Sequence, residues 1–174
     1  MRWIEKGKPG AGNITAFNND IPGTSRKDSL NFSAIFEITP PVEASGSYTL
    51  EEGKPYGPEK PTWVYTAPDS ISFWSDYISG AHRMENGNTF INEGAKGRMF
   101  EVTPKGAIVW EYLNPYVGNA HQLNGEPIKD KNYFQFRSTF IPANHPAFAS
   151  RDLKPIDPQP KVFTLPPPKE DEKK

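Results

Sequence analysis

Four side chains of this sequence are candidates for contact with an anionic group: Arg2, Ser79, His82 and Arg83. The guanidinium group is the side chain best suited to an oxyanion, because its planar fork presents paired N–H donors. His82 is the only histidine inside a clearly predicted strand. For both arginines the competing interpretation is an ordinary ion pair at the surface.

Strand alternation indicates how His82 is oriented. It places Ile78, Gly80, His82 and Met84 on one face of the predicted strand, and Tyr77, Ser79, Ala81 and Arg83 on the other. Because His82 shares its face with apolar neighbours, the pattern favours a packed, hydrogen-bonded histidine. The alternatives are a histidine that lines a channel and a histidine that binds a metal.

Several kinds of chemistry are excluded or unsupported. The chain has no cysteine, so disulfides, thiolate metal sites and cysteine nucleophiles are excluded. Its three histidines lack metal-ligand spacing, and no Ser-His-Asp order, glycine-rich phosphate loop or paired-carboxylate signature is present. We therefore predict no metal site and no cofactor.

The net charge and the hydropathy of the chain indicate which classes of partner are not expected. A formal net charge of -1 gives no global attraction to nucleic acid or to an acidic membrane. No apolar run approaches the roughly 18–20 residues that a membrane span requires. We expect neither a nucleic-acid partner nor a membrane span.

The elements that must position these residues are short strands. The 174 residues include 14 Gly and 19 Pro, which disfavour helix interiors, and aromatic residues make up 13% of the chain. Three blocks then recur in the same order, which indicates an internal repeat. The first copy contains Gly12–Phe17, Phe36–Pro40 and Trp63–Pro68, and the second contains Gly87–Asn92, Phe100–Pro104 and Trp110–Pro115. Two insertions, Asp20–Asn31 and Pro41–Pro61, lengthen the first copy and are predicted to be surface loops.

The second copy shows the repeating unit most cleanly. Tight turns separate four predicted strands, Ser75–Met84, Thr89–Glu93, Arg98–Thr103 and Ala107–Leu113. A four-stranded antiparallel meander in about 40 residues matches one propeller blade. The paired aromatics of the last strand in each copy, Trp63 with Tyr65 and Trp110 with Tyr112, share one face of their strand and suit packing between blades.

The predicted fold is all-β, a β-propeller fragment of about two four-stranded blades. Residues 1–68 form a blade with long loop insertions, whose first strand is truncated at Met1–Ile4, and residues 69–118 form the second blade. Residues 119–154 form a C-terminal segment in which Tyr133–Ile141 is a strand that begins another blade or closes the ring. Residues 155–174 form a tail rich in proline and charge, of which Pro166–Lys174 is predicted to be disordered.

Over roughly residues 1–152 the chain resembles the bacterial arylsulfotransferase family. The resemblance rests on Gly10–Ile14 with Phe17–Asn19, Ser79–Arg83 followed by Asn86–Thr89, Phe100–Gly106 and Val109–Tyr112. It implies a six-bladed periplasmic propeller that moves a sulfuryl group from a phenolic sulfate ester to a phenol. In that family a histidine in the central channel attacks sulfur and is transiently sulfated, while other histidines and an arginine stabilise the transferring group.

The family's nucleophile does not map onto this sequence. It lies in a Gln-His-x-Ala-like stretch on the first strand of a blade, before a turn and a Phe-Asp-Asn-Gly run. The matching run here is Phe17–Asp20, so the histidine is expected a few residues before Met1. No catalytic residue is therefore assigned within the chain, which is expected to be inactive alone. Arg2, Ser79, His82 and Arg83 are the candidates for binding the sulfate.

Three hypotheses for the function follow. The first is part of an arylsulfotransferase-like enzyme, periplasmic or secreted, whose partners are small phenolic sulfates, phenols and further blades of the propeller. The alternative is a non-catalytic propeller that binds a ligand or a protein. A third is a quinone-cofactor dehydrogenase-like propeller, whose tryptophan motif Trp63 and Trp110 match only superficially. Two blades leave a blade face and sheet edges open, so the isolated chain is expected to be poorly soluble or to self-associate.

Overall fold

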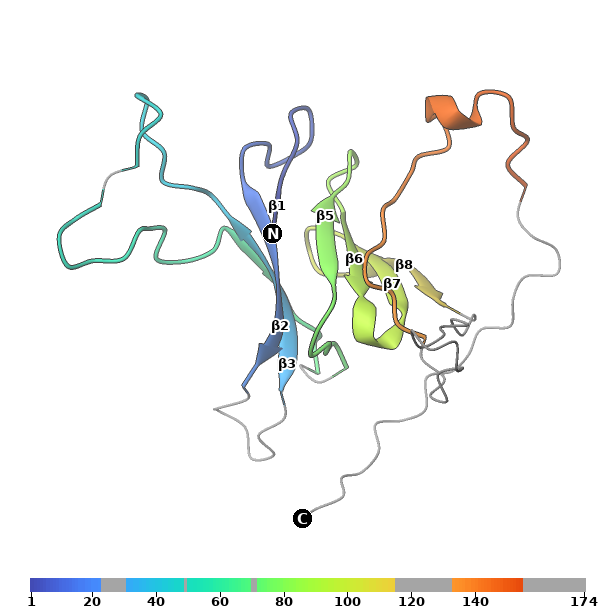
Figure 1. The fold of residues 1–174 in the computed structure, drawn as a ribbon, viewed down its shortest axis with the longest axis horizontal. Helices are drawn as coiled ribbons and strands as arrows, with labels where there is room; N and C mark the ends of the chain where they lie inside the picture. The colour runs from blue at the N-terminus through green and yellow to red at the C-terminus, as the bar shows by residue number, and fades with distance from the viewer. Residues whose placement is uncertain (23–30, 49, 70–71, 115–132, 155–174) are drawn as a thin grey trace, which may run out of the picture.

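Two four-stranded antiparallel sheets lie side by side in a computed structural model that describes residues 1–22, 31–48, 50–69, 72–114 and 133–154 (Figure 1). The first sheet has the order β1-β2-β3-β4 and the second the order β5-β6-β7-β8. The described part of the chain contains no α-helix, so the all-β prediction is confirmed. The two sheets do not close into a ring within the described residues.

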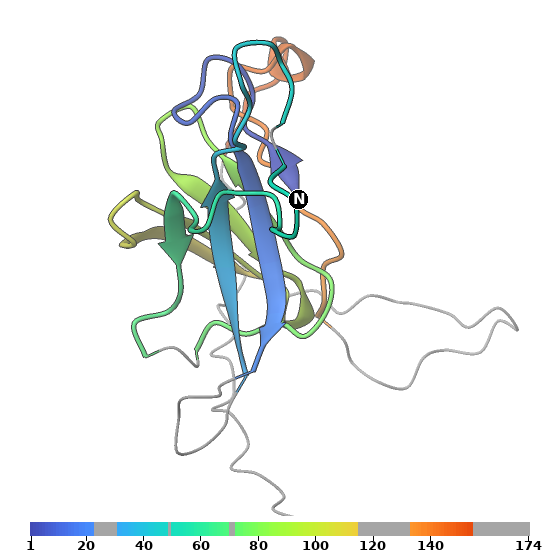
Figure 2. The same ribbon diagram turned by 90° about the vertical axis from the view of Figure 1, so that its left-hand side faces the viewer.

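The first sheet is formed by the N-terminal copy of the repeat, and Figure 2 shows its strands in the foreground. Its strands are β1 (Arg2–Trp3), β2 (Ile14–Ile21), β3 (Phe32–Ile38) and β4 (Trp63–Tyr65). The turn between β1 and β2 is closed by hydrogen bonds between Ile4 N and Asn13 O, at 2.8 Å, and between Gly12 N and Ile4 O, at 3.1 Å. The described residues between β3 and β4 project away from the second sheet, as predicted for a surface loop (Figure 1).

The first predicted insertion, Asp20–Asn31, is only partly a loop. Strand β2 continues through Asp20 to Ile21, which pairs with Phe32 after a register shift. Residues 23–30 lie outside the described part of the chain.

The second sheet follows the predicted meander closely. Its strands are β5 (Gly80–Arg83), β6 (Thr89–Glu93), β7 (Arg98–Val102) and β8 (Ile108–Leu113). The Asn-Gly turn forms as expected, with Gly87 at a φ of 87° and Met84 N donating to Asn88 O at 2.8 Å. After β6, the short 3-10 helix η1 (Gly94–Lys96) turns the chain into β7.

The prediction of a strand beginning at Ser75 was wrong over Ser75–Ser79. There the Ser75 hydroxyl donates to Tyr77 O at 2.8 Å and receives the backbone N–H of Ala95 at 3.0 Å. Ile78 has a φ of 36°, a left-handed conformation that interrupts an extended strand. The segment is thus a side-chain-bonded bend, and β5 begins only at Gly80.

The core lies between the two sheets. Phe73 and Phe100 are fully buried there, and their rings meet edge to face with centroids 5.5 Å apart. Tyr65 packs against both rings, at 5.5 and 5.8 Å. The prediction that the paired aromatics pack between sheets is therefore confirmed for Tyr65. The remaining buried members of this core are Ile35, Ala67, Ile91 and Val102.

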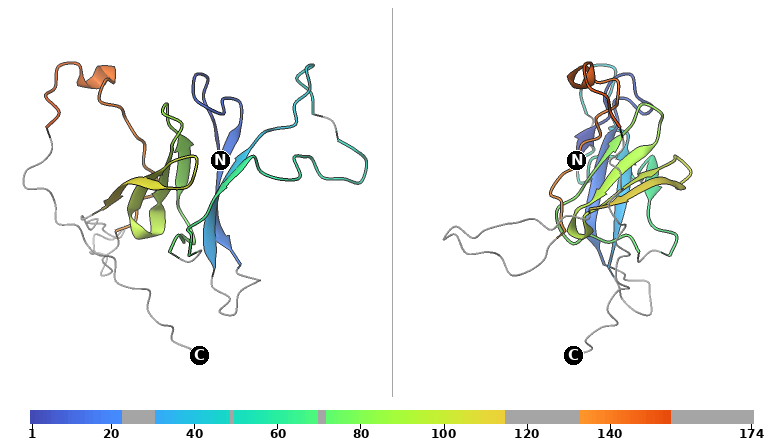
Figure 3. Two further views of the ribbon diagram at one scale, coloured as in Figure 1. Left: turned by 180° about the vertical axis from the view of Figure 1, so that it is seen from behind. Right: turned by 90° about the vertical axis from the view of Figure 1, so that its right-hand side faces the viewer.

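The segment 133–154 runs beside the second sheet on the side turned away from the first (Figures 1 and 3). Its described residues contain the short 3-10 helix η2 (Pro146–Phe148) and no strand, so the strand predicted at Tyr133–Ile141 was wrong. Gln135 N donates to Gly94 O in the corner after β6, and Asn92 Nδ2 donates to Gln135 O, both at 3.0 Å. The segment is thus anchored to a corner and to a side chain, and not to a strand edge. The predicted tail, 155–174, lies outside the described residues.

Candidate anion-binding pocket

A cavity of about 340 Å³ lies where the first strands of both sheets meet the segment around Arg137. β1 and β2 supply one wall, the residues that lead into and form β5 supply a second, and the C-terminal segment supplies a third. We call this cavity the anion pocket. Its lining residues are Met1, Arg2, Thr15, Phe17, Asn19, Ser79, Gly80, Ala81, His82, Arg137, Ser138 and Thr139.

Two arginines from distant parts of the chain line this pocket. Arg2 belongs to β1, an edge strand, and pairs with Thr15 of β2. Arg137 comes from the C-terminal segment, where its guanidinium carbon lies 6.0 Å from the ring centroid of Phe136. Neither guanidinium forms an ion pair with a carboxylate of the described residues. Two arginines therefore line one cavity, and neither is in an ion pair with a described side chain, although Glu5 lies near enough to Arg2 for their charges to interact.

His82 lies beside these arginines in a partly buried position. Its ring packs on Phe90 with centroids 5.0 Å apart. Burial, followed by the positive charges of Arg2 and Lys8, lowers the pKa of His82 to about 4. The imidazole is therefore neutral near pH 7 and keeps a nitrogen lone pair. The predicted packing is present, and the same residue also lines the anion pocket.

Ser79 is held in the pocket by hydrogen bonds to neighbouring side chains. Its hydroxyl accepts from Asn19 Nδ2 at 3.0 Å and donates to Ser75 Oγ at 3.0 Å. In the C-terminal segment, Ser138 Oγ donates to Asn92 Oδ1 at 2.9 Å. The hydroxyls of Ser79 and Ser138 are therefore both held by neighbouring side chains.

Arg83 lies outside the anion pocket. It is 6% exposed and forms an ion pair with Glu37 of the first sheet, while its Nη1 donates to Gly87 O at 2.8 Å. It contributes instead to a neighbouring cavity of about 250 Å³. The expectation that Arg83 contacts an anion, and its alternative of a surface ion pair, are both replaced by a buried pair between the sheets.

Three of the four candidate residues, Arg2, Ser79 and His82, are thus brought together in the anion pocket. The sequence reasoning missed Arg137 and Asn19. The motif Phe17–Asn19 was noted, but nothing placed Asn19 next to Ser79. Arg137 lay in a segment predicted as a strand, and contacts of that segment with the second sheet bring it to the pocket, among them the hydrogen bonds of Gln135 with Gly94 and Asn92.

Other functional features are sparse in the described part of the chain. It contains no group of three or more histidine, aspartate or glutamate side chains that could hold a metal ion. It also has no helix with the length and apolar character to cross a membrane. Comparisons with protein-family models, with curated proteins and with solved structures each returned no match.

Proposed function

We propose that this chain is part of an arylsulfotransferase-like β-propeller and that the anion pocket binds the sulfate group of a phenolic sulfate ester. The observation that carries the proposal is that Arg2 and Arg137, neither of them in an ion pair with a described carboxylate, line one cavity together with a neutral His82. The sequence resemblance and the two meander sheets support it. On this proposal the protein acts in the periplasm or outside the cell.

The chemistry of the ligand fits the walls of the pocket. A sulfate monoester presents three oxygens that share a negative charge, and each guanidinium can donate two parallel hydrogen bonds to such a group. Ser79 and Ser138 add neutral polar groups, and Phe17 adds an aromatic side chain. A cavity of about 340 Å³ lies at the small end of the usual range for ligand sites, which suits a single phenyl ring with its sulfate.

The proposal assigns binding of the sulfate, and not attack on sulfur, to these residues. In the transfer step a histidine nitrogen forms a bond to sulfur while the bond from sulfur to the phenolic oxygen breaks, and the phenolate leaves. The oxygen of an acceptor phenol then forms a bond to sulfur while the bond from sulfur to the histidine nitrogen breaks, which regenerates the histidine, and the phenolic proton passes to solvent. The two arginines would stabilise the charge of the transferring group in both steps.

Calorimetric titration with 4-nitrophenyl sulfate tests the binding. We expect the ester to bind and 4-nitrophenol, which lacks the sulfate, to bind at least about tenfold more weakly. Arg2→Ala and Arg137→Ala should each weaken binding of the ester by about ten- to a hundredfold, because each removes hydrogen bonds to a charged group. Arg151→Ala, at an exposed arginine outside the pocket, is the matched control and should leave affinity unchanged.

The second measurement asks whether the chain itself transfers a sulfuryl group. The release of 4-nitrophenol is followed with and without a phenol acceptor. Because no nucleophile is assigned within the chain, we expect binding without release; acceptor-dependent release would show that the chain carries the nucleophile itself and would favour the enzyme over the non-catalytic alternative. Absence of binding, or equal loss in Arg151→Ala and Arg137→Ala, would overturn the assignment of the pocket.

A further inference from the structure

A second cavity, of about 250 Å³, lies next to the anion pocket, and we call it the rim pocket. It is bounded by the turn after β1, the turn after β5 and the C-terminal segment, and Figure 1 shows both turns at the same end of the two sheets. The apolar side chains of its lining are Met84, Phe140 and Pro142, and its surface is mainly apolar. The rim pocket therefore differs in character from the polar anion pocket beside it.

The two cavities lie along one face of β5. Side chains on one face of a strand are two residues apart, and Gly80, His82 and Met84, which directly follows β5, have this spacing. Gly80 and His82 line the anion pocket, whereas His82 and Met84 line the rim pocket. In the C-terminal segment, Thr139 lines the first cavity and Phe140 the second. The face from Gly80 to Met84 spans about 13 Å of extended chain, which is longer than one phenyl ring with its sulfate.

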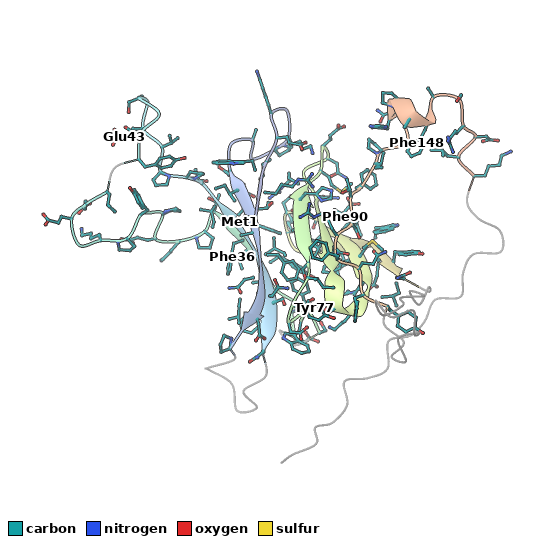
Figure 4. All side chains as sticks on the ribbon, viewed as in Figure 1. Met1, Phe36, Glu43, Tyr77, Phe90 and Phe148 are labelled. Atoms are coloured by element: carbon teal, nitrogen blue, oxygen red, sulfur yellow. The ribbon has the colours of Figure 1, made fainter. Side chains whose placement is uncertain are left out.

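Two aromatic side chains of the rim pocket rest on the buried ring of Phe90, which Figure 4 labels. The centroid of Phe90 lies 5.0 Å from that of His82 and 6.3 Å from that of Phe140. The lowered pKa of His82 leaves its imidazole neutral near pH 7. An aromatic ring of a ligand can therefore pack against His82 and Phe140 without desolvating a charge.

The cations of the rim pocket already have carboxylate partners. Lys8 Nζ lies 2.7 Å from Glu5 Oε2, and Arg83 pairs with Glu37. The two arginines of the anion pocket form no ion pair with a carboxylate of the described residues. This difference orients a ligand that enters both cavities: its sulfate belongs in the anion pocket, and an uncharged, apolar part belongs in the rim pocket.

We propose that the rim pocket binds the second aromatic ring of a two-ring aryl sulfate, whose sulfate and first ring occupy the anion pocket. The inference rests on the proposed function and gives that site a preference among phenolic sulfates. A second ring in the para position extends away from the sulfate, as the line of side chains from Gly80 to Met84 requires. An apolar cavity of about 150 Å³ is enough to hold benzene, so the rim pocket, at about 250 Å³, has room for one ring.

The three methionines of the chain report on the two cavities separately. Met1 lines the anion pocket, Met84 lines the rim pocket, and Met99, in β7, lines neither. The full chain is prepared with isotope-labelled methionine methyl groups and titrated with phenyl sulfate or with biphenyl-4-yl sulfate. Because the ring current of an aromatic ligand shifts the NMR signals of nearby methyl groups, the spectrum shows which cavity each ring enters.

We expect phenyl sulfate to shift the methyl signal of Met1 alone, and biphenyl-4-yl sulfate to shift those of Met1 and Met84, with Met99 unchanged by both. In calorimetric titration the two-ring ester should bind at least about tenfold more tightly than phenyl sulfate, because a further ring is buried. Biphenyl-2-yl sulfate is the matched ligand control, since it has the same composition but carries its second ring beside the sulfate. It should show neither the shift of Met84 nor the gain in affinity.

Phe140→Ala removes an aromatic side chain from the rim pocket and should abolish most of the gain in affinity for biphenyl-4-yl sulfate. Phe148→Ala is the matched control, because Phe148 belongs to the same segment, in η2, but lines neither cavity (Figure 4). It should leave the gain unchanged.

The results also separate this inference from the proposed function. If phenyl sulfate binds but biphenyl-4-yl sulfate leaves Met84 unshifted, the inference is overturned and the proposed function stands. An equal gain for the biphenyl-2-yl ester, or a gain that survives Phe140→Ala, would likewise overturn the inference and indicate a non-specific apolar contact. If phenyl sulfate does not bind at all, the proposed function fails and the inference fails with it.

Discussion

Replacing Arg83 with methionine should destabilise the protein substantially, because it leaves a carboxylate buried between the sheets. The side chains of Arg83 and Glu37 are 6% and 8% exposed. Removing one partner of such a pair typically costs about 3–5 kcal/mol, since the remaining charge keeps its desolvation penalty. The hydrogen bond from Asn13 to Glu37 is retained and offsets about 1 kcal/mol. We therefore expect Arg83→Met to lower the free energy of unfolding by about 2–4 kcal/mol.

Urea unfolding followed by circular dichroism measures this change. The matched variant is Arg83→Met combined with Glu37→Gln, which removes the stranded charge and should recover about half of the loss. With a slope of about 1–3 kcal/mol per molar urea, the single variant should shift the midpoint by about 1 M or more. The reasoning is refuted if Arg83→Met costs less than about 1 kcal/mol, or if the two substitutions are additive, because a buried pair must show coupling.

Three further perturbations test other parts of the structure. His82 should titrate by NMR with a pKa of about 4. In the unfolded state its imidazole takes up a proton near pH 6.5, so the free energy of unfolding should fall as the pH drops from about 6.5 through 4. Above about pH 6.5 the contribution of His82 should not change with pH. Affinity for 4-nitrophenyl sulfate should likewise not rise as pH falls from about 8 to 5.5, whereas an ordinary histidine would raise it. Phe100→Ala, at a fully buried ring, should cost about 3–5 kcal/mol in urea unfolding. Gly94→Ala would place a methyl 2.3 Å from Ile78 O and 2.7 Å from Gln135 O, so it should displace the segment that carries Arg137 and weaken ester binding in the same titration.

Local sequence was sufficient to predict the limits of a strand where turn residues lie directly at both of its ends. Strand β6 has the predicted limits, Thr89–Glu93, because the Asn-Gly turn before it and the glycines after it fix both ends. The same reasoning failed at Ser75–Ser79. There the hydroxyl of Ser75 bonds the corner at Ala95, and that contact, between residues on opposite sides of β5 and β6, leaves no periodic signal.

The pocket was predictable to the extent that it is built from first strands. Arg2 and His82 were identified because both lie on predicted first strands, and the innermost strands of a propeller line its channel. Arg137 was not, since the hydrogen bond from Gln135 N to Gly94 O depends on the close backbone approach that a glycine without Cβ permits. The alternation of side chains correctly placed Arg83 on the face opposite His82. Its burial could not be predicted in this way, because it depends on Glu37, which belongs to the other sheet.

Alternation along β5 links the stability of the protein to its proposed binding site. His82 and Arg83 are adjacent, so their side chains leave the strand on opposite faces. Arg83 holds the first sheet through Glu37, while His82 lines the anion pocket, whose other walls include Arg2 and Thr15 of that first sheet. The separation of the pocket walls therefore depends on the buried ion pair, although Arg83 lies outside the pocket. A ligand that contacts Arg2 and Ser79 together bridges both sheets, and it must stabilise the same interface that the ion pair maintains.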